Sequence, residues 1–239
     1  MTIEHPREPS RGASSVAVGS APALLRLLWL ASPALPIGAY AYSRGLEQAV
    51  ARDWVRDEAT LGRWIRGVLH RQLATLDAPI MLRVLRAARA ADRAAIERWN
   101  DFLLAHRESR EFALEDAQLG GSLARLLREL RDACAGLLPD KPGHATAFGV
   151  AAAAGECAER DVLAAFLFGF AENQITAALK CLSMGQTAGQ RVLAQLSAEL
   201  PALVEQSWQR EDDQLGSFAP GLSLASALHE TQYTRLFRS

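Results

Sequence analysis

Metal coordination is the first chemistry that the side chains could support, because the chain holds five histidines and three cysteines. No two histidines stand four residues apart, and none is spaced from a cysteine as in a zinc site. The adjacent residues His229 and Glu230 are the best candidates for an exposed pair of ligands. Two ligands do not complete a site, so we expect no metal centre and no cofactor.

Nucleotide binding and nucleophilic catalysis have little support. The chain has no GxxxxGK[ST] loop, and the glycines of "SMGQTAGQR" fit a turn between two helices. No serine, cysteine or histidine has the spacing of a catalytic elbow or pair. Cys157 and Cys181 fall in apolar helical segments, where thiols are expected to be buried and inert.

A polar interruption in an apolar segment is a stronger candidate. Glu172, Asn173 and Gln174 interrupt a helix that is otherwise apolar all round, and Lys180 is the next charge along it. A buried polar group without a partner costs about 1–3 kcal/mol, so we expect these groups to have partners. They can form a structural network where the helix reaches the surface, or a functional polar patch. A helical enzyme that uses Glu172, Asn173 and Lys180 remains one alternative.

The last segment, "ETQYTRLFRS", combines aromatic and basic side chains. Aromatic and arginine side chains dominate the energetics of protein interfaces. This tail can therefore be a docking peptide, or it can complete the core of its own chain. Both interpretations stay open on the residues alone.

The composition favours an all-α fold, because alanine and leucine dominate and β-branched residues are sparse. The net charge of −1 gives no basic excess for nucleic acid. The longest fully apolar run, residues 162–171, is too short to span a bilayer, so we expect no membrane partner. The three widely spaced cysteines favour a reducing cytoplasm over a disulfide framework.

We expect residues 1–20 to form a flexible N-terminal arm and residues 21–239 to form a single-domain bundle of roughly eight to ten helices. Apolar periodicity places helices at residues 23–31 and 43–55, the second with Ser43 as its N-cap. Asp77 and Pro79 mark another helix start. Gly120 and Gly121 lie inside a long helix at 109–135, where a kink or a close helix contact is expected. A helix at 186–209 contains a proline and is expected to bend or split there.

The stretch "SPALPIGAYAYSRGLE" lies between two of these helices. No strand precedes its glycines and no lysine follows them, so it is not a phosphate loop. We interpret it as a proline-stiffened turn that presents Tyr40 and Tyr42 before the next helix begins.

Three motifs together resemble the urease accessory protein UreF family in order and spacing: "LLRLLWLASPALPIGAYAYSRGLE", "NQITAALKCLSMGQTAGQRVL" and "LHETQYTRLFRS". The segments "FGVAAAAG" and "LGGSLARLL" resemble the middle helices of that family, so the resemblance covers residues 24–239. It implies an all-α protein without enzymatic activity that acts in nickel insertion into urease. It also implies that the protein bridges the accessory protein UreD (also called UreH) and the GTPase UreG, acts on the urease apoprotein, forms a homodimer, and lines a path for nickel or modulates the GTPase.

The resemblance assigns candidate partner-binding residues in three groups. The N-terminal signature comprises Pro33, Pro36, Gly38, Tyr40, Tyr42, Ser43 and Glu47. The side facing the GTPase comprises Asn173, Lys180 and Gln186. The tail comprises His229, Glu230, Tyr233, Arg235, Leu236, Phe237 and Arg238.

The chain departs from the family pattern at three places, which are Ser183-Met184, Gly121 and Ser223. The resemblance also does not show whether the signature serves folding or docking. A generic helical adaptor is the alternative to a urease maturation factor.

Overall fold

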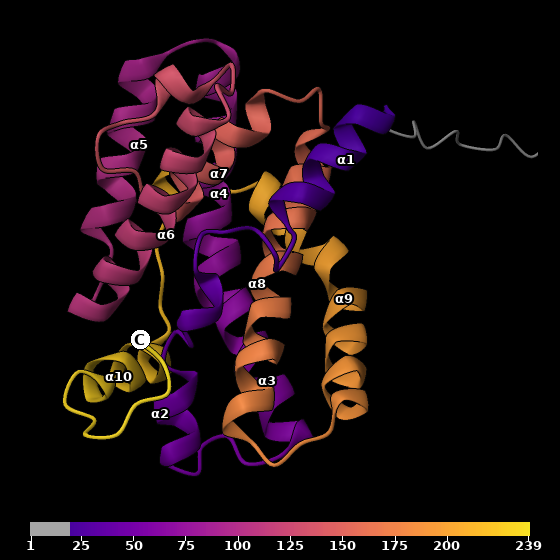
Figure 1. Cartoon of the computed structure of the whole chain (residues 1–239), viewed down its shortest axis with the longest axis vertical. Coiled ribbons are helices and arrows are strands. Elements are labelled where there is room, and N and C mark those ends of the chain that lie inside the picture. Colours follow the sequence, from indigo (N-terminus) through magenta and orange to yellow (C-terminus); the bar gives the residue numbers. More distant parts are fainter. Residues whose placement is uncertain (1–19) are drawn as a thin grey trace, which may run out of the picture.

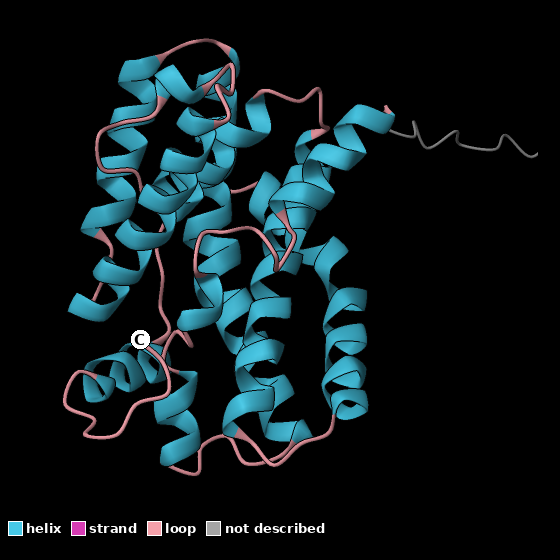
Figure 2. Cartoon of the chain, in the orientation of Figure 1, coloured by secondary structure: helices cyan, strands magenta, loops and turns pink. Residues whose placement is uncertain are grey.

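A computed structural model describes residues 20–239, and the expected flexible arm at residues 1–20 falls almost entirely outside this range. Every regular element in the described residues is helical (Figure 2), which confirms the all-α fold. The α-helices are α1 (Ala21–Leu30), α2 (Leu46–Ala51), α3 (Glu58–Val68), α4 (Ala78–Arg89), α5 (Arg93–Ala105), α6 (Arg110–Glu129), α7 (His144–Ala153), α8 (Glu159–Cys181), α9 (Gln186–Trp208) and α10 (Pro220–His229).

The helices form two connected groups (Figure 1). Helices α5, α6 and α7 lie together at one end, and α3, α8 and α9 run side by side at the other. Helix α4 joins the groups because it packs against α5 and α7 and also contacts α8 and α9. Helix α10 packs on α2 and α6, and the chain then turns back so that its C-terminal end lies beside α2.

The segment from α3 to α4 is one continuous helical stretch. A π-helix at Leu69–Asp77 links the two helices, whereas the sequence predicted a new start at Asp77 and Pro79. Asp77 does not cap α4 and instead forms an ion pair with Arg107 at 2.7 Å, where both side chains are 2% exposed. Pro79 is the second residue of α4 and lies directly after the π-helix, within this continuous stretch.

Two other helix boundaries differ from the prediction. Helix α2 begins at Leu46 and ends at Ala51, inside the predicted range of 43–55. The reason is that Arg44 and Gly45 both adopt positive φ angles, of 49° and 75°, which no α-helix allows. Ser43 therefore precedes the helix and is not its N-cap.

The predicted close contact at Gly120 is confirmed. A Cβ atom at this position would lie 2.1 Å from the carbonyl oxygen of Pro142, so only glycine lets α6 approach the loop that leads into α7. Helix α9 contains Pro201 but is assigned as a single helix, so the predicted split does not occur.

Helix α8 is the central element of the bundle. It is long and apolar enough to cross a membrane by length and composition, with a mean hydropathy of 1.4, and half of that window is buried in the protein. It packs most extensively on α9 and also contacts α1, α2, α3 and α4. These contacts are those of a core helix in a helical bundle.

Candidate functional site

The three sequence motifs meet in one place, which we call the motif junction: residues 40–47, residues 173–180 of α8, and residues 229–239 of the tail. The tail leaves α10, loops outward and returns to end beside α2 (Figure 1). Within the tail, the backbone amide of Arg238 donates to the carbonyl oxygen of Ala41 at 2.8 Å. Residues separated by nearly the whole described chain are therefore hydrogen-bonded neighbours.

Glu47 is the main acceptor for the tail. Its carboxylate accepts hydrogen bonds from the backbone amides of Leu236 and Phe237, at 2.7 and 3.0 Å. The side-chain amide of Gln232 donates to it at 3.2 Å. Glu47 is only 7% exposed, so these donors replace the water that an ionised carboxylate would otherwise need. The glutamate of the signature thus fixes the path of the tail.

Ser43 holds the end of the tail. Its backbone amide and its hydroxyl both donate to the main-chain oxygen of Ser239, at 2.9 and 2.5 Å. The hydroxyl of Ser239 donates to Glu115 at 2.5 Å, and Glu115 pairs with Arg44 at 2.9 Å. All these groups are buried, so the tail is part of a closed hydrogen-bond network.

His229 lies at the centre of this network and is fully buried. Its Nδ1 atom is 2.7 Å from Glu111, and its Nε2 atom is 3.1 Å from Glu47. Arg235 pairs with the other oxygen of Glu111 at 2.9 Å. Burial raises the pKa of Glu111, and His229 and Arg235 partly offset that rise. The expectation that His229 and Glu230 form an exposed ligand pair is therefore wrong for His229.

Helix α8 is hydrogen-bonded to the backbone of the signature. The side-chain amides of Asn173 and Gln174 donate to the carbonyl oxygens of Tyr42 and Ser43, at 3.3 and 3.0 Å. These bonds confirm the expected partners for Asn173 and for the amide nitrogen of Gln174. Within residues 20–239, however, the carboxylate of Glu172 has no hydrogen-bond partner and the side-chain oxygen of Gln174 is buried without one. The Nζ atom of Lys180 lies 5.7 Å from the ring centroid of Tyr40 and 5.3 Å from that of Phe237. Lys180 thus bridges the signature and the tail through cation–π contacts.

The junction leaves three large side chains in solvent. Tyr40 is 64% exposed, Leu236 is 68% exposed and Tyr233 is completely exposed. In contrast, Tyr42 and Phe237 are 6% and 5% exposed and belong to the core. The expectation that the turn presents both tyrosines is wrong for Tyr42, because the extended backbone at this residue points its ring inward as the chain enters α2.

The other candidate residues lie at the edges of this arrangement. Gly38 has a φ of 79°, so the turn needs glycine there, while Pro33 and Pro36 are exposed along it. Glu230 accepts from the backbone amide of Arg110 at 3.1 Å. Two more candidates, Gln186 and Arg238, have exposed side chains. Gln186 begins α9, and no side-chain hydrogen bond connects it to the junction within residues 20–239.

Several residues of the junction were missed by the sequence analysis, namely Arg44, Glu111, Glu115 and Gln232. A signal existed for two of them. Glu111 and Glu115 stand four residues apart on the same face of α6 as Leu119, where an outward-facing acidic pair would not be expected. Buried acids on an apolar stripe predict basic or donor partners elsewhere in the chain.

The residues proposed for a helical enzyme do not form one site. Asn173 and Lys180 contact the signature, whereas Glu172 lines a separate groove on another side of α8. Within residues 20–239, no group of three histidine, cysteine or acidic side chains is placed to hold a metal ion.

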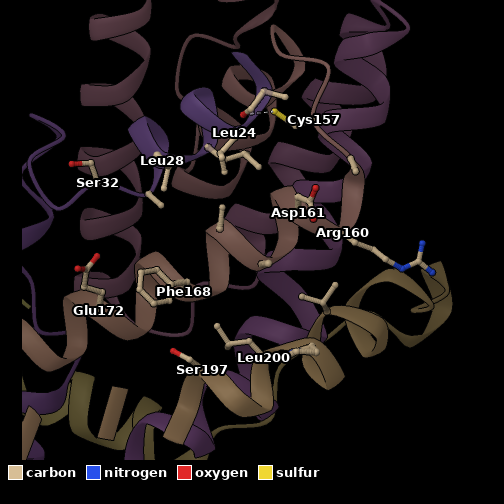
Figure 3. Close-up of a pocket in the computed structure, with 18 of the residues that line it drawn as sticks. Leu24, Leu28, Ser32, Cys157, Arg160, Asp161, Phe168, Glu172, Ser197 and Leu200 are labelled. Carbon is tan, nitrogen blue, oxygen red and sulfur yellow. Dashed lines mark hydrogen bonds between the residues drawn. The ribbon is translucent and has the colours of Figure 1, made fainter. Parts of the chain in front are cut away.

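That groove has a volume of about 930 Å³. It lies between α1, α8 and α9 and is mostly apolar. Figure 3 shows Leu24 and Leu28 of α1 on one side and Phe168 of α8 and Leu200 of α9 across from them. Leu24, Leu28 and their neighbour Leu25 are all more than half exposed.

Comparisons with known proteins agree with the motifs. The UreF family model matches residues 55–197. The urease accessory protein UreF of Chromohalobacter salexigens is 47% identical over 218 residues, which cover 91% of this chain and 95% of that protein. UreF of an Azoarcus species is 48% identical over 224 residues (90% and 95%), and UreF of Marinobacter nauticus is 45% identical over 223 residues (91% and 94%). This chain therefore belongs to the UreF family of urease accessory proteins.

Proposed function

We propose that this protein is a non-catalytic urease maturation factor that bridges UreD (UreH) and the GTPase UreG in the cytoplasmic complex that inserts nickel into the urease apoprotein. Membership of the UreF family supports the role in urease maturation. The bridging of these two partners and the cytoplasmic location rest on the resemblance of the motifs.

The observation that carries the proposal is a rigid tail with exposed apolar side chains. Tyr233 and Leu236 point into solvent, while the backbone between them and Ser239 is held by Glu47 and Ser43. A backbone that is already held in place loses less conformational entropy when the side chains on it bind a partner. Tyrosine is also enriched among residues that dominate binding energy. We assign the tail and Tyr40 to the binding of partner proteins.

Asn173, Lys180 and Gln186 are proposed to face the GTPase. Of these, Lys180 and Gln186 have exposed side chains, whereas the side chain of Asn173 already contacts Tyr42. We therefore assign direct contacts to Lys180 and Gln186, and we assign to Asn173 the role of holding the signature in place.

The apolar groove is proposed to form the interface of a homodimer. Monomeric proteins seldom expose a large contiguous apolar patch, and such a patch typically marks an interaction site. Leu24, Leu25 and Leu28 follow one another along α1 and leave their side chains largely in solvent. A second copy that packs its own α1 across this groove would cover these leucines on both chains.

Co-purification tests the proposed function. This chain is expressed with UreD- and UreG-type proteins from the same source, and complexes are isolated through a tag on UreD. We expect a complex that contains all three proteins. The variant Tyr233→Ala should reduce recovery of this complex, while the exposed substitution Leu114→Ala, on α6 and outside the junction, should not. If the wild-type chain forms no complex with UreD, the proposed function fails.

A further inference from the structure

A small hollow lies where the start of α10 meets α3, and we call it the α3–α10 hollow. Its lining comes from three places, which are α3, the π-helix at Leu69–Asp77 and the segment at 218–222. It has a volume of about 280 Å³ and shares no lining residue with the α1 groove or the motif junction. Pockets for small molecules typically measure about 300–1,000 Å³, so this hollow is better sized for a side chain of a protein partner.

The loop that leads into α10 is held on the π-helix by its backbone. The amide of Phe218 donates to the carbonyl oxygen of Arg71 at 3.1 Å, and the amide of Gly216 donates to that of Thr75 at 3.2 Å. Pro79, four residues after Thr75, has no amide hydrogen to donate to this carbonyl from within the helix. The helical stretch therefore offers free acceptors, and they fix the backbone that carries Phe218.

The side chain of Phe218 is not covered by this arrangement. It is 74% exposed, although its backbone is bonded to the π-helix. A single exposed apolar residue would need no explanation. Phe218, however, lines the same hollow as Trp64, which is half-buried, and Val68, which is buried. Phe218 thus adds an exposed ring to an apolar hollow that the chain itself leaves unfilled.

Two arginines give the hollow its charge. Arg63 and Arg71 both line it, and their side chains are exposed. Within residues 20–239, neither guanidinium forms an ion pair or donates a hydrogen bond, and the lining contains no acidic residue. Arg66 on the same helix, by contrast, pairs with Glu199 at 2.6 Å. The hollow is therefore apolar with an unbalanced positive charge.

These side chains are those that protein interfaces favour, because tryptophan, phenylalanine and arginine are enriched there. The planar guanidinium of arginine also matches a carboxylate with two parallel hydrogen bonds. We propose that the α3–α10 hollow binds a partner protein through a segment that places an apolar side chain in the hollow and carboxylates on Arg63 and Arg71. This surface is additional to the proposed function, which assigns partner contacts to the tail, Tyr40, Lys180 and Gln186.

The first test locates the partner by crosslinking. Phe218 is replaced by the photoreactive residue p-benzoylphenylalanine, and the chain is expressed with UreD, UreG and the urease apoprotein from the same source. The same replacement at Leu114, which is 51% exposed on α6, is the control. After irradiation, we expect position 218 to crosslink to one of the co-expressed proteins, at a peptide with acidic residues next to an apolar one. Position 114 should not crosslink to that peptide.

The other outcomes of this test contradict the proposal. Position 218 could form no crosslink, crosslink only within its own chain or to a second copy, or crosslink to a peptide without acidic residues. Failure of the proposed function gives a different result, because a chain that forms no complex with UreD can still crosslink to UreG or to urease. Conversely, a complex with UreD that gives no crosslink at position 218 would reject only the binding at the hollow.

The second test reverses the charge of the hollow. Arg63→Glu combined with Arg71→Glu should lower the crosslinking yield at position 218 by about tenfold or more, since like charges would then face each other. Arg125→Glu combined with Arg128→Glu is the matched control, because it changes the net charge equally at two exposed positions of α6. Equal yields from the two double variants would show that the arginines of the hollow do not recognise the partner.

The third test fills the hollow. Gly67 lines it within α3, and a Cβ atom there would meet no other atom within 4 Å. Gly67→Leu should therefore occupy the hollow and abolish the crosslink at position 218, without lowering the free energy of unfolding in urea, because leucine favours helix over glycine. Gly121→Leu, at an equally open position of α6, should leave the crosslink intact. Full crosslinking in a folded Gly67→Leu protein would overturn the proposal.

Discussion

The motif junction and the α1 groove are opposite kinds of surface. The junction brings parts of all three family motifs together, and many of their polar groups are already bonded within the chain. Ser43 and Glu47 bind the tail, and Gln174 binds the signature. The groove is lined in part by the apolar start of the first motif, and α1 leaves the side chains of Leu24, Leu25 and Leu28 largely in solvent there.

The difference between these two surfaces distinguishes motif residues that the fold itself requires from residues that are free to bind a partner. A motif residue that is buried and bonded is explained by the fold, and no partner is needed to account for it. Glu47 and Phe237 belong to this class, being 7% and 5% exposed. The large exposed side chains of the junction are Tyr40, Tyr233 and Leu236, and we propose that they contact partners together with Lys180 and Gln186. We therefore propose that the signature acts in docking only indirectly, through the bonds by which it fixes the tail.

The largest effect is expected for Glu47→Ala. This change leaves the amides of Leu236 and Phe237 and the buried ring of His229 without their acceptor. Removing one partner of a buried ion pair typically costs about 3–5 kcal/mol. The free energy of unfolding from urea titration should fall by that amount.

A matched control for Glu47→Ala is Glu97→Ala, which removes an exposed partner of Arg93 on α5. Exposed pairs of this kind contribute about 0.3–0.5 kcal/mol. If both variants lose the same small amount, Glu47 does not organise the junction, and the comparison above is wrong.

Substitutions at two neighbouring residues of the tail should change the free energy of unfolding by very different amounts. Phe237→Ala removes a core side chain and should lower the free energy of unfolding by about 3 kcal/mol or more. Leu236→Ala removes a side chain that is 68% exposed and should change it by less than about 0.5 kcal/mol. Thermal or urea unfolding of the two variants compares them directly. Equal losses would mean that the tail is packed differently from the structure.

His144 at the start of α7, close to Arg44 of the junction, should make the stability of the protein sensitive to acid. Burial lowers the pKa of His144 to about 4, and Asp116 and Arg44 lie close enough to influence it. Between about pH 6.5 and pH 4 the unfolded chain binds a proton at this histidine and the folded chain does not, so stability falls as the pH decreases. Over this range the wild type should lose on the order of 2 kcal/mol more than His144→Gln. Parallel urea titrations at both pH values measure the difference, and identical losses would exclude this role for His144.

Substitutions on the α1 side of the groove should weaken dimer formation and leave the free energy of unfolding nearly unchanged. Leu25→Asp combined with Leu28→Asp places two charges on the exposed face of α1. We expect unfolding to change by less than about 1 kcal/mol, because both side chains are already in solvent. Sedimentation analysis should show a dimer for the wild type and a monomer for the variant. A variant dimer as stable as the wild type would place the homodimer interface elsewhere.

The helices themselves were predictable because their apolar periodicity is strong. The α1 and α9 segments were predicted close to their observed bounds, and the close contact of α6 follows from Gly120. The π-helix at Leu69–Asp77 was not predictable, because Pro79 suggests a new start and nothing local indicates that the helix continues. The helix at α2 was predicted, but its later start was not, because Arg44 adopts a positive φ, a conformation that its residue type does not favour.

The arrangement of the site was predictable only in part. The sequence identified the three motifs, and it required partners for Asn173 and Gln174, which the structure supplies. It did not pair Glu47 with the tail, because the donors are backbone amides of Leu236 and Phe237, which every sequence has. Long-range bonds to the main chain leave no signal in residue types or spacing.

One double variant, Tyr233→Ala with Leu236→Ala, tests the central claim most directly. Both side chains are largely or fully exposed, and the backbone bonds of the tail do not depend on them. Urea unfolding and recovery of the UreD complex are measured on the same preparation. We expect the free energy of unfolding to stay within about 0.5 kcal/mol of the wild type while the complex is lost. Full recovery of the complex, or a loss of binding that merely follows a loss of stability, would contradict a tail that the signature holds in place for its partners.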